Sequence, residues 1–212
     1  MNLREASARV CADDSDTIAT ITTMSRALAH KLAGENAPFE DIELLTLAVS
    51  RECDRRVLEA ELQAIERTFG DAVAVNGATY VRHETGQIGY HSLCGTLHVE
   101  RATYRQTGVR NGSTVVPLDL AAGMIERGTP AMAKAVALGY AKHDMRDVSE
   151  DLEAAHRLPP SRATMERMAR QIAADAHAQA PVIERAVRLQ ERLPEGAHAI
   201  VIGLDRGSVP MA

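Results

Sequence analysis

Residues 89–105 read Gly-Tyr-His-Ser-Leu-Cys-Gly-Thr-Leu-His-Val-Glu-Arg-Ala-Thr-Tyr-Arg. The pair Cys94-Gly95 can turn the chain tightly, and the side chains from Thr96 to Tyr104 alternate between two faces. One face carries Leu97, Val99, Arg101 and Thr103, and the other carries His98, Glu100, Ala102 and Tyr104. The stretch therefore predicts a β-hairpin with Arg101 and Arg105 on one face of its second strand.

The chain before this hairpin predicts two helices followed by short strands. Residues 15–33 and 39–69 have helical composition and spacing, and after Gly70 the β-formers are broken by turn signals at Asn76-Gly77 and at Gly86. The second helix has one apolar stripe: Ile42, Leu45, Val49, Cys53, Val57, Leu58, Leu62 and Ile65. We interpret its other face as solvated, with a dimer arm as the alternative: Glu40, Glu43, Arg51, Glu52, Arg55, Arg56, Glu59 and Glu66.

Three short helices are predicted after Pro117-Leu118-Asp119. The first begins at the N-cap Thr129 with Pro130 next and runs to about Tyr140, and the second begins near Asp144 and stops before Leu158-Pro159-Pro160. Ser161 caps the third, whose apolar stripe is Met165, Met168, Ala169, Ile172, Ala173 and Ala176. Arg162, Arg167 and Arg170 are then left towards solvent. The spacing fits a helix-turn-helix that reads DNA or an αα-hairpin with a solvated arginine face, and it leaves both open.

The end of the chain predicts one more helix and a strand. Pro181 restarts a helix to about Leu193, and residues 199–204 form a continuous apolar run typical of a strand buried on both faces. Asp205 follows this strand directly. A carboxylate that leaves a buried strand is a candidate metal ligand, although aspartate is also a common turn residue.

Composition is that of a globular chain with an uneven charge. The 212 residues are 45% hydrophobic and 25% charged with net charge −5. Residues 1–100 hold 9 Lys and Arg against 16 Asp and Glu, of totals of 24 and 29. Residues 101–212 therefore hold 15 basic and 13 acidic residues, so that the first part is acidic and the second is slightly basic. If DNA is bound, we expect the C-terminal half to bind it. No apolar run is long enough for a membrane span or a secretory signal, which predicts a cytoplasmic location.

Histidine and cysteine residues gather around the hairpin without a recognised metal spacing. They are His83, His91, Cys94 and His98. A strand would place His91 and Cys94 on opposite faces, and the three cysteines of the chain contain no Cys-x-x-Cys pair. We interpret them as surface histidines and a reduced turn cysteine, and zinc is the alternative.

Three segments together resemble the ISKra-type insertion-sequence transposases, over about residues 80–212. Residues 93–104 are similar to the family's Leu-(apolar)-Gly-Thr-x-x-Val-x-Arg-x-x-Tyr hairpin, with Cys94 at the commonly aromatic position. The second segment is Pro117-Leu118-Asp119 with the helical stretch that follows through Ala174. The third is residues 203–211, Gly-Leu-Asp-Arg-Gly-Ser-Val-Pro-Met, which looks like the strand that carries the family's first catalytic aspartate, although Arg206 replaces the aspartate common in wider relatives.

The resemblance implies a function in DNA transposition. It implies an RNase H-like domain in which three acidic residues bind Mg²⁺, with Asp205 as the first catalytic residue and metal ligand. The sequence ends seven residues after Asp205, so we expect a front part that binds the terminal inverted repeats of the element in double-stranded DNA and is inactive by itself. The alternatives are a DNA-binding regulator of transposition and a helical interaction module without a DNA role. A homo-oligomer is left open.

The expected fold class is α+β, mainly α, in four parts. Residues 1–72 form an N-terminal helical region, and residues 73–118 form a β-hairpin module. Residues 119–195 form a helix-turn-helix-like DNA-binding region, and residues 196–212 form the first strand of a truncated RNase H-like domain. The expected DNA-binding residues are Arg101, Arg105, Arg162, Arg167 and Arg170.

Overall fold

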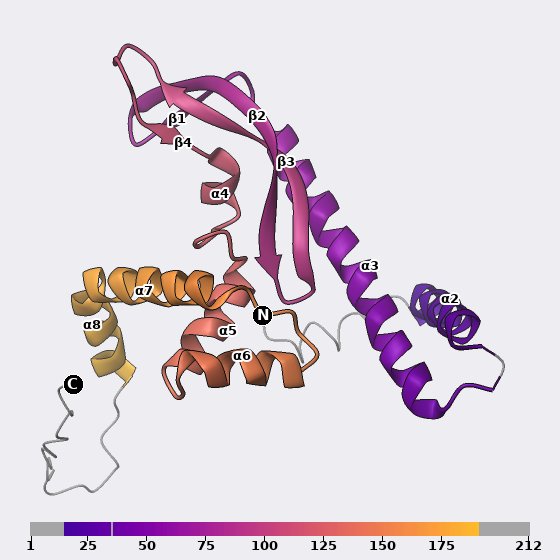
Figure 1. Cartoon of the computed structure of the whole chain (residues 1–212). Coiled ribbons are helices and arrows are strands. Elements are labelled where there is room, and N and C mark those ends of the chain that lie inside the picture. The colour runs from indigo at the N-terminus through magenta and orange to yellow at the C-terminus, as the bar shows by residue number, and fades with distance from the viewer. Residues whose placement is uncertain (1–14, 35, 191–212) are drawn as a thin grey trace, which may run out of the picture. The chain divides into compact units, whose positions relative to one another are not determined.

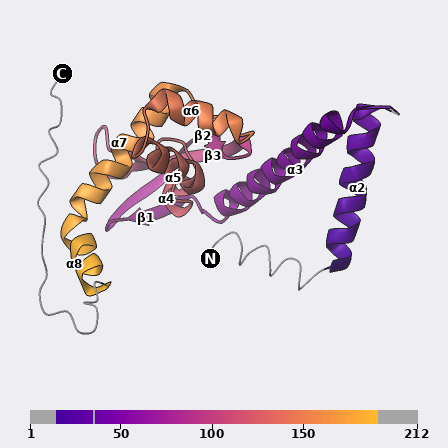
Figure 2. The ribbon, with the colours of Figure 1, turned by 90° about the horizontal axis from the view of Figure 1, so that it is seen from below.

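The structure is a computed structural model that describes residues 15–34 and 36–190 (Figures 1 and 2). It is a mixed helical and stranded fold that is mainly helical, as the sequence predicts. The chain divides into two compact units between Ile172 and Ala173, within helix α7 (Arg162–Ala178). The second unit holds the rest of α7 and helix α8 (Ala180–Gln190). The predicted strand at residues 199–204 and Asp205 lie outside the described residues.

Two long helices open the first unit. Helix α2 (Ser15–Ala33) ends at the predicted residue, and helix α3 (Phe39–Arg67) begins directly after Pro38. Proline favours this position because it has no N–H to leave unsatisfied. Ala29 of α2 and Val49 of α3 are buried where the two helices pack.

The β-sheet has four antiparallel strands in the order β1-β2-β3-β4. They are β1 (Ala72–Val75), β2 (Ala78–Ser92), β3 (Gly95–Gln106) and β4 (Thr114–Val115). Asn76 and Gly77 both have positive φ, 50° and 78°, as a two-residue hairpin turn requires. The predicted β-hairpin is present, but its two turn residues are Leu93 and Cys94 and not Cys94-Gly95, since Ser92 pairs with Gly95, the first residue of β3.

The prediction of a break at Gly86 is wrong. Strand β2 continues through Gly86, which pairs with Arg101 of β3, and the register shifts instead between Arg82 and Glu84. Glycine weakens a strand only by its backbone entropy, and a partner strand on one side is enough to hold it extended. The result is one long β2–β3 hairpin.

The buried side of β3 changes along its length. Leu97 and Val99 pack with Tyr90 of β2 and with Leu118 of helix α4 (Pro117–Ala121). Further along, Ala102 and Tyr104 are the buried residues and pack with Tyr80. The strict alternation predicted from Thr96 to Tyr104 therefore shifts by one residue after Arg101.

Helix α3 lies along the edge of β3, where its polar side chains replace a neighbouring strand. The N–H of His98 donates to Glu59 Oε1 at 2.7 Å, and the N–H of Glu100 donates to Gln63 Oε1 at 3.1 Å. The N–H of Ala102 donates to Glu66 Oε1 at 2.9 Å, and Glu66 is buried. The prediction that this face of the helix is solvated is thus wrong at Glu59 and Glu66, because their carboxylates satisfy backbone donors of an edge strand.

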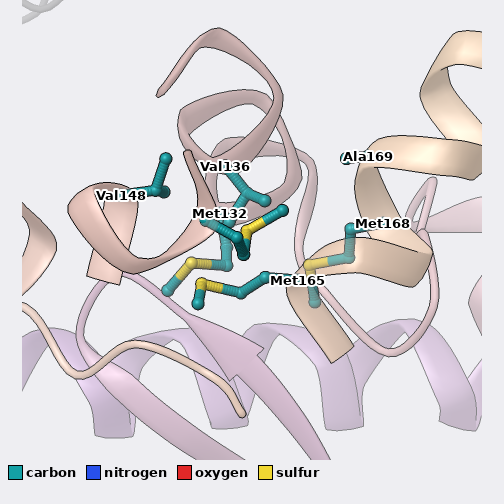
Figure 3. Packing of buried hydrophobic residues seen from close by; sticks show 7 residues of the cluster. Met132, Val136, Val148, Met165, Met168 and Ala169 are labelled. Atoms are coloured by element: carbon teal, nitrogen blue, oxygen red, sulfur yellow. The ribbon is translucent and has the colours of Figure 1, made fainter. Parts of the chain in front are cut away.

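Three helices share a second hydrophobic core (Figure 3). They are α5 (Pro130–Tyr140), α6 (Met145–Ala154) and the first half of α7. The core residues are Met132, Val136, Met145, Val148, Met165, Met168 and Ala169. This core connects to the hairpin where the N–H of Thr129 donates to the carbonyl of His91 at 2.8 Å. Within the described ranges, no helix is long and apolar enough to cross a membrane.

Candidate nucleic-acid interface

The first half of α7 is held rigidly by its cap and by its inner face. The N–H of Thr164 donates to Ser161 Oγ at 3.3 Å, as the sequence predicts for an N-cap serine. Met165, Met168 and Ala169 are buried in the three-helix core. The predicted stripe stops there, because Ala173 and Ala176 are exposed and Ile172 is only partly buried.

The outer face of α7 carries three exposed arginines that are paired with carboxylates. Arg162 Nε donates to Glu166 Oε1 at 2.9 Å, and Arg170 Nη2 donates to Glu166 Oε2 at 3.3 Å. Arg167 Nε donates to Glu126 Oε2 at 3.2 Å. The side chains of Arg162 and Arg170 are 74% and 76% exposed. We call Arg162, Arg167 and Arg170 the arginine face of α7.

A strained turn lies beside this face. Glu126 and Arg127 have φ of 50° and 63°, and Ile125 and Gly128 on either side exchange both backbone hydrogen bonds, at 2.9 and 2.7 Å. This two-residue turn normally contains Asn-Gly, because other residues are strained with positive φ. The tertiary contacts hold it: Glu126 accepts from Arg167 of α7, and Arg127, the next residue of the turn, is exposed. The sequence pattern did not predict this turn, since Glu-Arg is not a turn signal.

The turn packs closely against α7. A Cβ added to Gly128 would lie 2.5 Å from Met168 Cε and 3.1 Å from the carbonyl oxygen of Ile125. Because one of these atoms belongs to the backbone, a larger residue could not be accepted by a side-chain movement alone. Gly128 therefore allows the turn to pack against Met168 on the inner face of α7.

The connections between the three helices leave both predicted interpretations open. Residues 141–144 join α5 to α6, and residues 155–161 join α6 to α7. Helix-turn-helix units usually have a turn of about three or four residues between their helices, so the second connection is longer than usual. The predicted start of α6 at Asp144 is confirmed, since its carboxylate accepts from the N–H groups of Arg146 and Asp147. These two hydrogen bonds lower the pKa of Asp144.

Arg101 does not face the solvent as the hairpin pattern predicts. Its side chain is only 13% exposed, its Nη1 lies 3.8 Å from Asp119 Oδ2, and its guanidinium stands 5.8 Å from the ring centre of Tyr90. The Tyr90 hydroxyl donates to the same carboxylate. Burial and this carboxylate both raise the pKa of Tyr90. Helix α4 covers this part of the sheet, and so Arg101 belongs to an internal polar cluster with Tyr90 and Asp119.

Arg105 is exposed, but it lies far from α7. It pairs with Thr114 of β4, ten residues along β3 from Gly95, which is about 33 Å at the rise of a strand. The opposite end of the hairpin, at Leu93, is the end that meets the loop before α7, through Arg157. The structure therefore does not bring Arg105 together with the arginine face of α7.

The comparisons with known proteins give no further constraint. No protein-family model, curated protein or solved structure matches the chain. The resemblance to the ISKra-type transposases rests on the residues quoted from the sequence.

The described residues contain no donor set for a metal. Asp205 lies outside them, and within residues 15–34 and 36–190 no group of three or more His, Cys, Asp or Glu side chains could hold an ion. Burial raises the pKa of Cys94 and lowers that of His91, and the charge of Arg127 lowers the His91 pKa further.

Proposed function

We propose that the chain binds double-stranded DNA through the arginine face of α7, and that it acts in insertion-sequence transposition by recognising the terminal repeats of the element in the cytoplasm. The observation that carries the proposal is the two-sided character of the first half of α7. Its inner face is locked into the α5–α6–α7 core, while Arg162, Arg167 and Arg170 stand on its outer face. A rigid helix with outward arginines suits the major groove.

The carboxylates beside these arginines do not prevent DNA binding. The ion pairs to Glu166 and Glu126 are exposed, and pairs of this kind contribute only about 0–1 kcal/mol each. A phosphate can therefore replace a carboxylate at low cost, and the release of counterions from DNA favours the exchange. Glu166 also holds Arg162 and Arg170 at fixed positions on one row of the helix, because these residues are four apart.

The strained turn supports the same surface. A strained backbone conformation persists in a folded protein only where the surrounding contacts hold it in place, and such conformations are frequent at functional sites. Here Glu126 of the turn accepts a hydrogen bond from Arg167, and Gly128 allows the turn to lie close to Met168 of the same helix. Glu166 and Glu126 make the face nearly balanced in charge without DNA, so we expect base contacts and shape to contribute as well as phosphate attraction.

The test measures DNA binding by fluorescence anisotropy over a series of salt concentrations. The specific duplex has a sequence that is first selected from a random DNA library by binding to the immobilised full chain. A duplex of equal length with the same bases in scrambled order is the reference. We expect Arg162→Ala or Arg167→Ala to cost about 1–3 kcal/mol on the enriched duplex if the residue reads a base. A phosphate contact would instead weaken both duplexes alike and lower the salt slope by about one.

Arg188→Ala is the matched control. Arg188 is 71% exposed and pairs with a glutamate four residues away, as Arg162 does, but it lies on α8 and in neither proposed binding surface. We expect this variant to bind like the parent. The decisive variant replaces Arg162, Arg167 and Arg170 together: if it folds and binds as tightly as the parent at ordinary salt, the α6–α7 segment is an αα-hairpin with a solvated face and the proposal is wrong.

A regulator of transposition would use the same arginine face. It would occupy the terminal repeats without joining DNA strands, so DNA binding alone does not separate it from a transposase. Competition does: a regulator reduces strand joining by an intact transposase of the same element in proportion to its occupancy of the repeats. If the chain has no salt-dependent affinity for any duplex, an interaction module without a DNA role is favoured.

A further inference from the structure

Helices α2 and α3 expose far more apolar surface than their own packing uses. Ile21, Met24, Leu28 and Leu32 lie on one stripe of α2 and are 51%, 68%, 44% and 58% exposed. Where the two helices pack, Ala29 is the buried residue of α2 and Val49 is the buried residue of the first part of α3, residues 39–57. Helix hairpins need an apolar stripe covered on both helices to be stable in water.

The stripe borders an open groove between the two helices. The groove has a volume of about 370 Å³ and is lined mostly by apolar side chains: Leu28, Leu32, Leu45, Ala48, Val49, Glu52, Cys53 and Arg56. Figures 1 and 2 show α2 beside the first half of α3, away from the sheet that the second half of α3 contacts. Monomeric proteins seldom expose a contiguous apolar patch larger than roughly 300–600 Å².

We propose that this surface binds a second copy of the chain, and that the α2 stripe of each copy fills the α2–α3 groove of the other around a two-fold axis. A stripe and a groove on the same two helices are the complementary halves that an isologous interface needs. The proposal is independent of DNA binding, because it uses a different surface.

Charge on the two helices favours this occupant and sets its orientation. The second half of α2 carries Arg26, His30 and Lys31 without an acidic residue, and the first turns of α3 carry Glu40, Asp41 and Glu43. Lys31 borders the α2 stripe and Asp41 borders the groove side of α3 by helical spacing. Neither has an ion-pair partner in the part of the chain that the structure describes. When the two α2–α3 connections lie at the same end of the dimer, Lys31 of each copy meets the partner's Asp41.

The first test is sedimentation of the full chain with substitutions in the stripe. We expect the parent to be a dimer at tens of micromolar, and Met24→Glu to weaken the dimer about 30-fold or more, because it places a charge in the apolar contact. Leu120→Glu is the matched control, since Leu120 is 61% exposed on α4, and we expect it to remain dimeric. Far-ultraviolet circular dichroism checks that each variant keeps its helices.

The second test uses charges on the rim and does not require a change in the stripe. Lys31→Glu alone and Asp41→Lys alone each place like charges opposite one another in a homodimer, and each should weaken dimerisation about three- to tenfold. An equal mixture of these two variants should dimerise like the parent, because both contacts between unlike chains are then attractive. Contacts within one chain could not be restored by mixing.

The proposal is wrong if the parent sediments as a monomer under these conditions. It is also wrong if Met24→Glu and Leu120→Glu have equal effects, or if mixing the two charge variants does not restore the dimer that each has lost. If Met24→Glu fails to fold, the mixture of rim variants decides by itself.

Discussion

Single residues of this chain take roles that depend on what covers them. Arg101 and Arg105 stand four residues apart on one strand, yet Arg101 is held against Tyr90 and Asp119 while Arg105 is exposed. A covered arginine contributes to stability, because its removal leaves a carboxylate without its counter-charge. An exposed arginine is available to a ligand.

Replacement of these two arginines should therefore affect the free energy of unfolding to different extents. We expect Arg101→Ala to lower the free energy of unfolding by about 2 kcal/mol, because it removes the partner of Asp119 and the cation above the Tyr90 ring. Arg105→Ala should change it by less than about 0.5 kcal/mol. Urea unfolding followed by circular dichroism measures both. If Arg101→Ala is as stable as the parent but binds DNA more weakly, Arg101 is a DNA contact and not part of an internal cluster.

His91 should make stability depend on pH. Burial and Arg127 lower the pKa of His91 below its ordinary value of 6.5, so the unfolded chain binds a proton at a pH where the folded chain does not. Stability is therefore fully present above pH 6.5 and falls as the pH drops from there towards the folded pKa. His91→Gln should flatten the part of the unfolding free-energy curve just below pH 6.5. An unchanged slope there would mean that other groups cause the dependence.

At the scale of elements, the contact between α3 and β3 determines how the sheet edge is protected. A strand edge with free N–H groups is a template for aggregation, and here three acceptors of one helix occupy alternate N–H groups of β3. Helix and strand periods roughly match over this length, because residues three or four apart on a helix advance by about 4.5–6 Å and alternate strand residues by about 6.6 Å. The same helix also supplies Leu62 to the core.

Loss of the buried acceptor should cost more than loss of the exposed one. We expect Glu66→Ala to destabilise the fold by about 2–3 kcal/mol, because it leaves the N–H of Ala102 unpaired in a buried position. Gln63→Ala should cost about 1 kcal/mol or less, since its hydrogen bonds are exposed. Glu66→Gln keeps an oxygen acceptor and is the control. Equal losses in chemical denaturation for the two alanine variants would contradict the role assigned to Glu66.

At the scale of the whole molecule, the two proposals together predict avidity. A dimer carries two arginine faces. Once one face is bound to a duplex with two sites, binding of the second face is intramolecular, and the overall affinity is higher than for a duplex with one site. We expect Met24→Glu to weaken binding to a two-site duplex by at least about tenfold and to leave single-site binding unchanged. Fluorescence anisotropy measures the affinity of each variant for the two-site duplex and for the single-site duplex. If the ratio of these two affinities is the same for Met24→Glu as for the parent, the two arginine faces of a dimer do not bind one duplex together.

The sequence by itself determined the local structure of most of the chain. The end of α2 at Ala33, the β-hairpin that turns between Ser92 and Gly95, and the caps at Thr129, Asp144 and Ser161 follow from side chains within a few residues of one another. Periodicity and capping act over short separations, so a single sequence contains them in full. The exposure of Arg162, Arg167 and Arg170 follows in the same way, because the apolar stripe of one helix turn fixes its opposite face.

Only the tertiary structure decided which polar residues are covered. Glu66 and Ala102 are 36 residues apart, and Tyr90 and Asp119 are 29 apart. Helical spacing places Glu66 on a polar face, and strand alternation places Arg101 on the same face as Arg105. Neither pattern indicates that β3 packs against Glu66 or that α4 packs over Arg101. The turn at Glu126-Arg127 is likewise held by its packing on Met168 and not by its own residues. Burial of a polar group depends on partners distant in the chain, and for that reason local patterns determined the elements while packing determined the role of their polar faces.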